Sequence, residues 1–337
     1  MLNTYPLYHK PPSLSNPGER RVLKNSENTS KMLFNLLIGL GRPVVVQYVK
    51  LAHRFHPHPE KPENLLLGRQ VGNLPRNRGQ HKNMQITRES IFNDPEVRKR
   101  AHFLLRKINK AIRDYSLIED GDKIAVAVSG GKDSLTLLHL LHWRRNFVPQ
   151  KYELIAVNVQ TDYGYGASRE TLEAIFQREG LPYVFEHVSL KEGSRVDKEP
   201  LNCFWCSWNR RKALFLTAHR LGCNKLAFAH HADDAAATLL LNLFYHGRVE
   251  GMKPKLEFFG GVITVIRPLI YVEESEILRF ARAAKLMLAV DDCPLKKATK
   301  RARMKELVKA LERELPQIKV NLLKVALGTR YGRHRNM

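Results

Sequence analysis

The sequence predicts an α/β protein in which helices cover both faces of a parallel sheet, and two observations indicate this class. From about residue 89 onward, short apolar runs alternate with segments whose apolar residues recur at helical spacing. Several runs are apolar at nearly every position, which is typical of parallel strands buried on both faces. Strands of this kind in alternation with helices predict a sheet built from strand–helix–strand units.

The first element of this pattern is a helix over residues 94–118, which opens with Asp94 and Pro95. Residues 123–129 follow as an apolar strand that runs into two glycines. The remaining elements are expected in alternation, and no internal repeat is visible. They are a helix at 133–145, a strand at 152–160, a helix at 168–180, a strand at 182–190, a helix at 210–222, a strand at 224–231, a helix at 233–247 and a strand at 260–269.

Composition divides the chain into three regions. Residues 1–83 are rich in Pro, Asn, Gly and basic residues, so we expect an irregular or disordered extension. Residues 84–294 carry the alternating pattern and are predicted to form the folded α/β domain. Residues 295–337 combine basic residues with apolar residues at helical spacing, which predicts a basic helical tail.

The chain shows no sign of a membrane or secreted location. No segment contains the roughly 18–20 uninterrupted apolar residues that span a bilayer. The apolar run at 32–40 is short and lacks the cleavage site of a signal peptide. Four cysteines in 337 residues do not make a disulfide framework. We therefore expect a cytoplasmic protein.

The chain is strongly basic, with a formal net charge of +23 and a pI of about 10.0. Part of the excess is concentrated in residues 295–337, which hold 13 Lys and Arg against 3 Glu. Clustered positive charge attracts polyanions, of which nucleic acid is the leading candidate, and the alternative is a solvated basic surface without a partner. A basic helix can follow a phosphate backbone, so the tail is predicted to bind nucleic acid.

A glycine-containing loop lies between the first predicted strand and the next helix. Its residues are Ser129, Gly130, Gly131, Lys132, Asp133 and Ser134. Glycines allow close backbone approach, and the amides at a helix start favour an anion. Lys132 adds a positive charge, whereas Asp133 is expected to hold Mg²⁺ or to cap the helix. The loop is shorter than the Walker pattern, and an ordinary strand–turn–helix is the alternative.

The cysteines offer a second candidate site. Cys203 and Cys206 have the spacing that lets two thiolates reach one metal centre, and Cys293 follows later. Basic residues after the pair are expected to keep the thiolates deprotonated: Arg210, Arg211 and Lys212. Cys223 is expected to be a small buried residue. Three interpretations remain open from these residues: a zinc site that also uses Cys223, a redox dithiol, and an iron–sulfur cluster with three cysteine ligands.

Polar residues follow two further strands at the edge where the glycine loop is expected. His230, His231, Asp233 and Asp234 could hold magnesium, transfer protons or position a nucleotide. The alternative is that one of the two aspartates caps the following helix. Asp162 follows the second strand and is expected to be a solvated loop residue, with the adenine of a nucleotide lying against residues 157–159.

The glycine loop resembles that of the PP-loop ATP pyrophosphatases, which cleave ATP between the α and β phosphates. The loop, the Cys-x-x-Cys pair, the run from Ala229 to Asp234, the Arg-Pro-Leu at 267–269 and the Cys-Pro at Cys293 look like the tRNA 2-thiocytidine synthetase family over residues 90–330. The resemblance implies that Cys203, Cys206 and Cys293 hold a 4Fe–4S cluster whose open iron binds the sulfur to be transferred.

The same resemblance implies the reaction and the roles of other residues. ATP would adenylate O2 of cytidine 32 in tRNA, and sulfur would then displace AMP. ATP would be bound with Mg²⁺ by Ser129, Gly130, Gly131, Lys132, Asp133, Ser134 and His230. Asp234, Lys132 and Arg210 would be catalytic. The partners would be tRNA, ATP and a sulfur donor, either a cysteine desulfurase or sulfide, and a homodimer is compatible with the sequence.

Two rival functions remain at this point. A tRNA(Ile)-lysidine synthetase has a similar loop and a similar His-His-Ala-Asp-Asp run, but it needs no cysteine cluster. A zinc-bearing RNA-binding protein without catalysis would use all four cysteines as ligands. Cys203, Cys206 and Cys293 therefore discriminate against the lysidine synthetase, and a zinc ion bound by all four cysteines would favour the RNA-binding protein.

Overall fold

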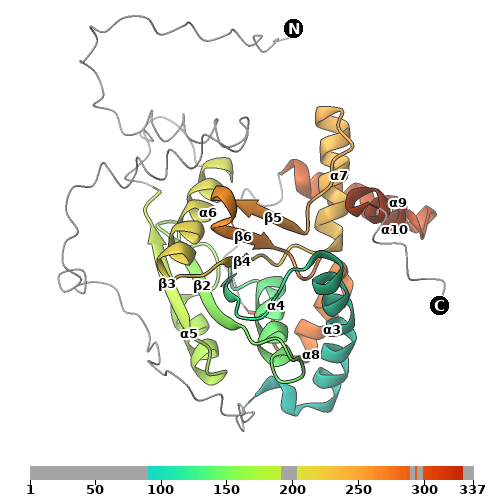
Figure 1. Cartoon of the computed structure of the whole chain (residues 1–337). Coiled ribbons are helices and arrows are strands. Elements are labelled where there is room, and N and C mark those ends of the chain that lie inside the picture. Colours follow the sequence, from blue (N-terminus) through green and yellow to red (C-terminus); the bar gives the residue numbers. More distant parts are fainter. Residues whose placement is uncertain (1–89, 191–202, 289–292, 294–298, 329–337) are drawn as a thin grey trace, which may run out of the picture. The chain divides into compact units, whose positions relative to one another are not determined.

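The computed structural model describes residues 90–190, 203–288, 293 and 299–328 (Figure 1). The described residues all belong to one compact unit of the chain, Glu60–Met337. The predicted extension at 1–83 lies outside the described residues.

A six-stranded sheet forms the centre of this unit, in the order β3-β2-β1-β4-β6-β5. The strands are β1 (Lys123–Ala127), β2 (Glu153–Thr161), β3 (Tyr183–Val188), β4 (Lys225–Ala227), β5 (Lys255–Phe258) and β6 (Ile263–Ile266). Neighbouring strands are parallel except β5, which pairs antiparallel with β6. The predicted parallel sheet is confirmed. The sequence missed β5, because an edge strand that is only half-buried has no continuous apolar run.

The helices also follow the predicted order. They are α3 (Pro95–Tyr115), α4 (Lys132–Arg144), α5 (Arg169–Arg178), α6 (Cys203–Arg220), α7 (Ala232–His246), α8 (Glu274–Ala283), α9 (Lys300–Glu314) and α10 (Ile318–Leu327), with short 3-10 turns at Ile91–Asn93 and Phe259–Gly261. Helix α3 starts where expected, because the Asp94 carboxylate accepts a hydrogen bond from the Glu96 amide at 2.8 Å. Helix α6 begins at Cys203 rather than at 210, α8 was not predicted, and the predicted helical tail contains two helices, α9 and α10.

Helices cover both faces of the sheet, as predicted (Figure 1). On one face, α3, α4, α5 and α8 bury residues such as Leu104, Leu138, Phe176 and Phe280. On the other face, α6 packs over a second core that includes Ala218. Strand β1 contributes to both: Ile124 and Val126 lie in the first core and Ala125 in the second. This double burial is the reason that β1 is an uninterrupted apolar run.

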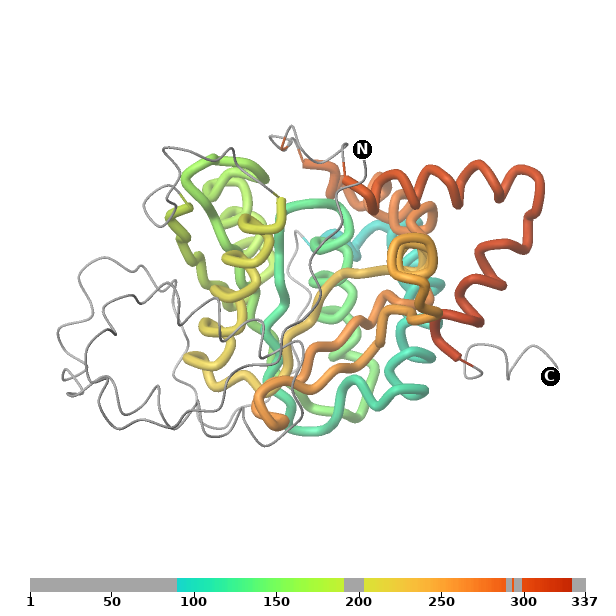
Figure 2. The backbone as a smooth tube through the Cα atoms, turned by 90° about the horizontal axis from the view of Figure 1, so that it is seen from above, coloured from blue at the N-terminus to red at the C-terminus, as the bar shows by residue number. Residues whose placement is uncertain are grey.

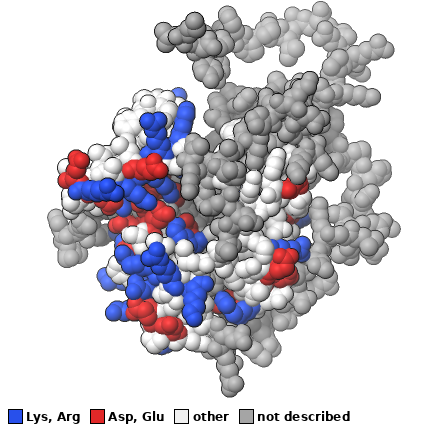
Figure 3. Space-filling view, turned by 180° about the vertical axis from the view of Figure 1, so that it is seen from behind, with Lys and Arg blue, Asp and Glu red and all other residues white. Residues whose placement is uncertain are grey.

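The helices of the basic region pack against the α/β domain. Met304 and Val308 of α9 form a small core with Ala236 and Leu240 of α7, and both α9 and α10 lie beside α7 (Figure 2). On the face in Figure 3, Lys and Arg side chains predominate over Asp and Glu and are interleaved with them. In the part of the chain that the structure describes, every helix is too short or too polar to cross a bilayer.

The order of the strands creates a switch point between β1 and β4. Chain connections proceed outward from β1 to β2 and β3 on one side, and from β4 to β6 on the other. Ligands of open α/β sheets bind in the crevice at the carboxyl ends of the strands at this point. The loop after β1 carries Ser129–Gly131, and the loop after β4 carries His230 and His231. The two predicted sites therefore meet at one edge of the sheet.

Candidate active site

The glycine loop is held by hydrogen bonds among its own residues at the start of α4. Ser134 Oγ donates to the Gly131 carbonyl at 2.9 Å and accepts from the Ser129 amide at 3.2 Å. Ser129 Oγ accepts from the Gly131 amide at 3.3 Å. The two serines therefore shape the loop directly, and the loop is formed without a ligand.

Gly130 and Gly131 differ in whether the backbone and the surrounding atoms would accept a larger residue. Gly130 has a φ of +82°, and a Cβ there would lie 2.3 Å from the Cβ of Ala167. Gly131 has a φ of −72°, and the nearest atom to an added Cβ is Ser129 Oγ at 3.5 Å, which is ordinary contact. The fold itself thus requires Gly130, whereas Gly131 leaves open surface beside the loop.

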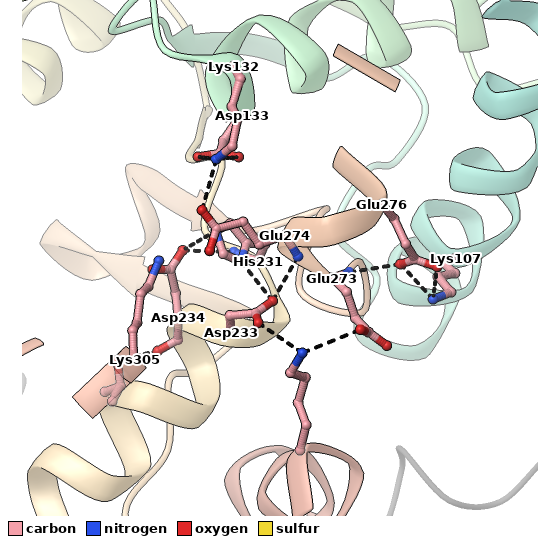
Figure 4. Close-up of polar contacts among 12 residues, drawn as sticks. Lys107, Lys132, Asp133, His231, Asp233, Asp234, Glu273, Glu274, Glu276 and Lys305 are labelled. Carbon is pink, nitrogen blue, oxygen red and sulfur yellow. Dashed lines mark hydrogen bonds and ion pairs between the residues drawn. The ribbon is translucent and has the colours of Figure 1, made fainter. Parts of the chain in front are cut away.

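Lys132 is held by two carboxylates in this structure. Its Nζ lies 2.9 Å from Asp133 and 3.0 Å from Glu274, the first residue of α8 (Figure 4). Burial lowers the pKa of Lys132, but the two carboxylates together raise it by more than burial lowers it. The net pKa therefore lies above its usual value. The expectation that Asp133 caps α4 is wrong, because Gly131 is the capping residue and no side chain caps it. Sequence reasoning missed Glu274, although an acidic run follows Arg-Pro-Leu.

Asp234 takes part in the N-terminal cap of α7, so the capping alternative is confirmed for this residue. Its Oδ2 accepts a hydrogen bond from the His231 amide at 3.1 Å. The His231 ring, which is 1% exposed, lies between the two aspartates, with Nε2 3.3 Å from Asp234 and Nδ1 3.4 Å from Asp233. The His-x-Asp-Asp stretch is therefore a buried structural unit whatever else it does.

Two lysines of the basic region reach these aspartates (Figure 4). Lys305 Nζ on α9 lies 2.8 Å from Asp234 Oδ1. Lys319 Nζ on α10 lies 3.1 Å from Asp233 Oδ1, and the Glu274 amide donates to Asp233 Oδ2 at 2.8 Å. The loop, α8, α7 and α10 are thus joined through Lys132, Glu274, Asp233 and Lys319. The helical spacing of the basic tail predicted α9 but not these partners.

The surrounding charges keep both aspartates ionised. Burial raises the pKa of Asp234, but the charges of His231 and Lys305 lower it by more than burial raises it. The net pKa is about 2. Burial likewise raises the pKa of Asp233, whereas hydrogen bonds from His231 and the Glu274 amide, with the Lys319 charge, bring it well below its ordinary value. Both side chains are therefore carboxylates at neutral pH.

Cys203 and Cys206 lie in the first turn and a half of α6. Cys203 is exposed, whereas Cys206 and Cys293 are half-buried. Burial raises the pKa of Cys206, Arg210 lowers it, and the charges of Cys293 and Cys203 raise it again, so the net pKa is above its ordinary value. The structure thus brings both other thiols within electrostatic reach of Cys206. The expected deprotonation of Cys206 by its basic neighbours is wrong, because burial outweighs Arg210.

The thiols of Cys203, Cys206 and Cys293 lie near one another but are not arranged as a complete set of metal ligands. Among the described residues, no three His, Cys, Asp or Glu side chains lie close enough together to hold a metal ion as they stand.

Cys223 lies at the opposite edge of the sheet. It is 3% exposed, and burial raises its pKa to about 11. The charges that act on it are those of Lys123 and Glu153, the first residues of β1 and β2. Cys223 follows the end of α6, so the cysteines at the start of that helix point to the other edge, where the loop lies. The buried role predicted for Cys223 is confirmed, and a zinc site made of all four cysteines is contradicted.

His230 is surrounded by positive charge. Its Nδ1 is buried and makes no hydrogen bond to a described residue. Burial and the charges of Arg267, Arg301 and Arg211 lower its pKa to about 3, although the charge of Asp234 acts in the opposite direction, so the ring is neutral. These three residues are called the arginine cluster below. Sequence reasoning did not single them out as a group, because they come from α6, the end of β6 and α9.

Asp162 has a structural role rather than a solvated one. Its Oδ2 accepts hydrogen bonds from the Leu190 amide at 2.7 Å and from Ser189 Oγ at 2.9 Å. These bonds connect the ends of β2 and β3. The prediction of a solvated loop residue is therefore wrong.

A mostly parallel sheet with the loop Ser129–Ser134 at its switch point defines a PP-loop protein. The family model for the PP-loop domain matches residues 101–311. Beyond this class, the chain belongs to the tRNA-cytidine(32) 2-sulfurtransferase family. It is 44% identical over 226 residues to the enzyme of that name from Geobacter sulfurreducens, covering 66% of this chain and 87% of the relative. It is 44% identical over 242 residues to that from Syntrophotalea carbinolica, covering 68% and 92%.

A solved structure has the same fold. The U34-tRNA thiolase NcsA from Methanococcus maripaludis, determined with its [4Fe-4S] cluster, superposes with a TM-score of 0.53 at 24% identity, covering 66% of this chain and 76% of that one.

Proposed function

We propose that this protein uses ATP to replace O2 of cytidine 32 in tRNA with sulfur. Membership of a family whose curated members are named tRNA-cytidine(32) 2-sulfurtransferases supports the proposal. The observation that carries it is the meeting of two sites at one edge of the sheet. The phosphate loop follows β1, and Cys203 and Cys206 begin the helix α6, which leads from β3 back to β4.

In the first step, cytidine O2 attacks the α phosphorus of ATP. A bond between O2 and phosphorus forms, and the bond to pyrophosphate breaks. The loop residues with His230 bind ATP, and Mg²⁺ is held at Asp133, since a carboxylate is its usual protein ligand. The proposal requires Lys132 to exchange Asp133 and Glu274 for phosphate oxygens. Lys132 then stabilises the charge that develops on the leaving pyrophosphate.

Asp234 acts in this scheme as a fixed negative charge and not as a proton acceptor. A carboxyl group with a pKa of about 2 is a weak base at neutral pH. Its ion pair with Lys305 and its bond to the His231 amide leave it suited to hold His230 and α7 beside the nucleotide. Arg210, one helical turn after Cys206, is proposed to stabilise negative charge on the activated base or the entering sulfur.

Cys203, Cys206 and Cys293 are proposed to hold a 4Fe–4S cluster. Thiolates are the usual ligands of such clusters, and the distant position of Cys223 leaves three cysteines for this site. When bound, a cluster with three protein ligands has one iron at which a sulfur atom can bind. Burial favours the protonated form of Cys206, so cluster binding must release its proton.

In the second step, a sulfur nucleophile attacks C2 of the adenylated cytidine. A C2–S bond forms, the C2–O2 bond breaks, and AMP carries the oxygen away. With sulfide as the donor, this exchange involves no change of oxidation state; a cysteine desulfurase would supply persulfide sulfur, which a two-electron reductant must convert to the sulfide level. In this scheme residues 84–294 act as the catalytic domain, and residues 295–337 contribute to tRNA binding. The protein acts in the cytoplasm. A homodimer is compatible with this scheme.

The test is a single-turnover reaction under anaerobic conditions with the purified protein, unmodified tRNA, ATP, Mg²⁺ and sulfide. The expected products are AMP, pyrophosphate and 2-thiocytidine at position 32, identified by nucleoside mass spectrometry. Formation of ADP would contradict the adenylation step. In a parallel reaction with lysine in place of sulfide, incorporation of lysine into tRNA would indicate the lysidine type of reaction instead.

A further inference from the structure

The arginine cluster lies at the same sheet edge, on the side away from β2 and β3. Arg267 directly follows β6, whose Ile266 pairs with Ala227 of β4. His230 comes three residues after Ala227, so the two side chains leave adjacent strands at the same edge. Arg301 of α9 donates from Nη2 to Thr238 Oγ1 on α7 at 3.3 Å. The segment from β4 into α7, the end of β6 and α9 thus converge here, and the charge of Arg211 on α6 acts on Arg267 as well.

The cluster carries positive charge that nothing described compensates locally. Burial lowers the pKa of Arg267 to about 10, and the charges of Arg211 and Arg301 add to this. Within the described residues, none of the three guanidinium groups forms an ion pair with a carboxylate. Lys132, Lys305 and Lys319 nearby are all paired. Mutual repulsion without a counter-charge destabilises the empty site.

Hydrogen-bonding capacity is also unused at this place. Arg267 Nη1 donates to the Lys253 carbonyl, but Arg267 Nε is buried with no partner among the described residues. His230 Nδ1 is in the same state. Buried polar atoms are usually paired in folded proteins, so the Arg267 Nε–H is available to an oxygen acceptor from outside the polypeptide. Guanidinium groups select planar or tetrahedral oxyanions, phosphate above all.

We propose that Arg211, Arg267 and Arg301 form a binding site for a backbone phosphate of the substrate RNA. This inference rests on the proposed function and specifies how the nucleotide next to the modified base is held. The phosphates of ATP have their own loop after β1 and their own cation, Lys132. Arg211 and Arg301 are exposed, so a long ligand can reach them from solvent. Arg211 also shares α6 with Cys206, so a phosphate here would lie beside the sulfur site.

The experiment measures the affinity of the full-length protein for unmodified tRNA without ATP, by fluorescence anisotropy at several salt concentrations. Arg301→Gln and Arg211→Gln each remove one exposed charge, and Arg303→Gln is the matched control, because Arg303 is an exposed arginine of the same helix that lies two residues further on and so on a different side of α9. We expect Arg301→Gln to weaken binding about tenfold and to reduce the salt slope by about one. Arg303→Gln should have an effect at least about fivefold smaller. Arg267→Lys keeps the positive charge but loses the planar guanidinium group, which can donate two parallel hydrogen bonds to a phosphate. It should weaken tRNA binding about as much as Arg301→Gln.

A second measurement, the affinity for Mg²⁺-ATP by titration calorimetry, identifies the source of the phosphate. Unchanged ATP affinity with weakened tRNA binding supports the site. Equal effects of Arg301→Gln and Arg303→Gln would mean that only net charge matters, and would overturn it. Reduced ATP affinity with unchanged tRNA binding would also overturn it, because the phosphate would then belong to the nucleotide.

The two proposals fail separately. A wild-type protein that binds tRNA through Arg301 but forms no 2-thiocytidine would overturn the proposed function and leave this site standing. A protein that thiolates tRNA while Arg301→Gln binds it as tightly as wild type would overturn this site alone.

Discussion

The two halves of the carboxyl edge of the sheet differ in how their charges are satisfied. One half is made by the loop, α7, α8, α10 and Lys305 of α9, and in it Lys132, Lys305 and Lys319 each contact a carboxylate at 3.1 Å or less. In the half made by α6, the end of β6 and the start of α9, the arginine cluster has no carboxylate partner among the described residues, and Cys206 has an unfavourable environment for its thiolate.

The difference teaches what each half needs from its ligands. The charges of the paired half already have partners, so the proposed function requires a nucleotide phosphate to replace Asp133 and Glu274 around Lys132. Among the described residues, the other half holds arginines without a carboxylate partner, the unpaired atoms Arg267 Nε and His230 Nδ1, and a Cys206 thiol that burial keeps protonated, so we propose that external groups complete it. The following predictions test this contrast, from the largest expected effect to the smallest.

The largest effect is expected from Cys206→Ser. Loss of one thiolate from a three-cysteine ligand set should reduce 2-thiocytidine formation by more than about 100-fold, since even residues behind the ligands cost 10–100-fold. Mg²⁺-ATP affinity should stay within about twofold, because the loop half is complete without the thiols. Cys223→Ala is the control and should keep product formation. Equal loss in both variants, measured by nucleoside mass spectrometry, would break the contrast.

Next is Lys132→Met, which removes the cation of the paired half. AMP formation in a single turnover should fall by about 10²–10³-fold, the usual loss when a charge-stabilising group is removed. Affinity for tRNA without ATP should not change. Lys123→Met removes a lysine at the opposite edge of the sheet and should retain AMP formation. If Lys132→Met instead weakened tRNA binding as strongly as Arg301→Gln, the two halves would not be separate sites.

The third prediction concerns stability. Lys319 is 7% exposed and contacts Asp233, Glu273 and Glu312. Lys319→Met leaves the buried Asp233 carboxylate with less compensation and should lower the free energy of unfolding by about 2–3 kcal/mol. Lys324→Met, an exposed position on the same helix, should change it by less than about 0.5 kcal/mol. Urea unfolding followed by circular dichroism measures both, and similar values would show that the Lys319 contacts do not stabilise the fold.

The smallest effect at neutral pH is the acid dependence of the same network. The pKa of Asp234 is about 2 in the fold against an ordinary 3.8. A lowered pKa contributes stability that is fully present above the ordinary value and is lost as the pH falls toward 2. We expect no change between pH 8 and 5, and a loss of about 2 kcal/mol from this group between pH 5 and 2.

Lys305→Met sharpens the acid prediction, because Lys305 is one of the charges that lower the pKa of Asp234. The variant should be less stable than wild type at pH 7, and the difference should shrink as the pH falls toward 2, because Asp234 becomes increasingly protonated in both. A difference that stays constant over this range, measured by urea unfolding at each pH, would exclude the ion pair as its source.

The sequence by itself determined the local features of this protein. The apolar runs that became β1, β2 and β3 are buried on both faces, so their hydrophobicity needs no partner to be recognised. The loop Ser129–Ser134 and the pair Cys203 and Cys206 were readable for the same reason: each lies within six consecutive residues. Their common edge also followed, because parallel strands end on the same side of a sheet.

Only the tertiary structure decided which charges meet. Lys132 and Glu274 form an ion pair although they are 142 residues apart in the chain. Lys319 contacts Asp233 because α10 packs against α7. The distance of Cys223 from the other cysteines, and the gathering of Arg211, Arg267 and Arg301, likewise depend on how whole elements are arranged. The physical reason is that periodicity is a short-range property of a segment, whereas the partner of a charge is set by the packing of elements that a single sequence does not order in space.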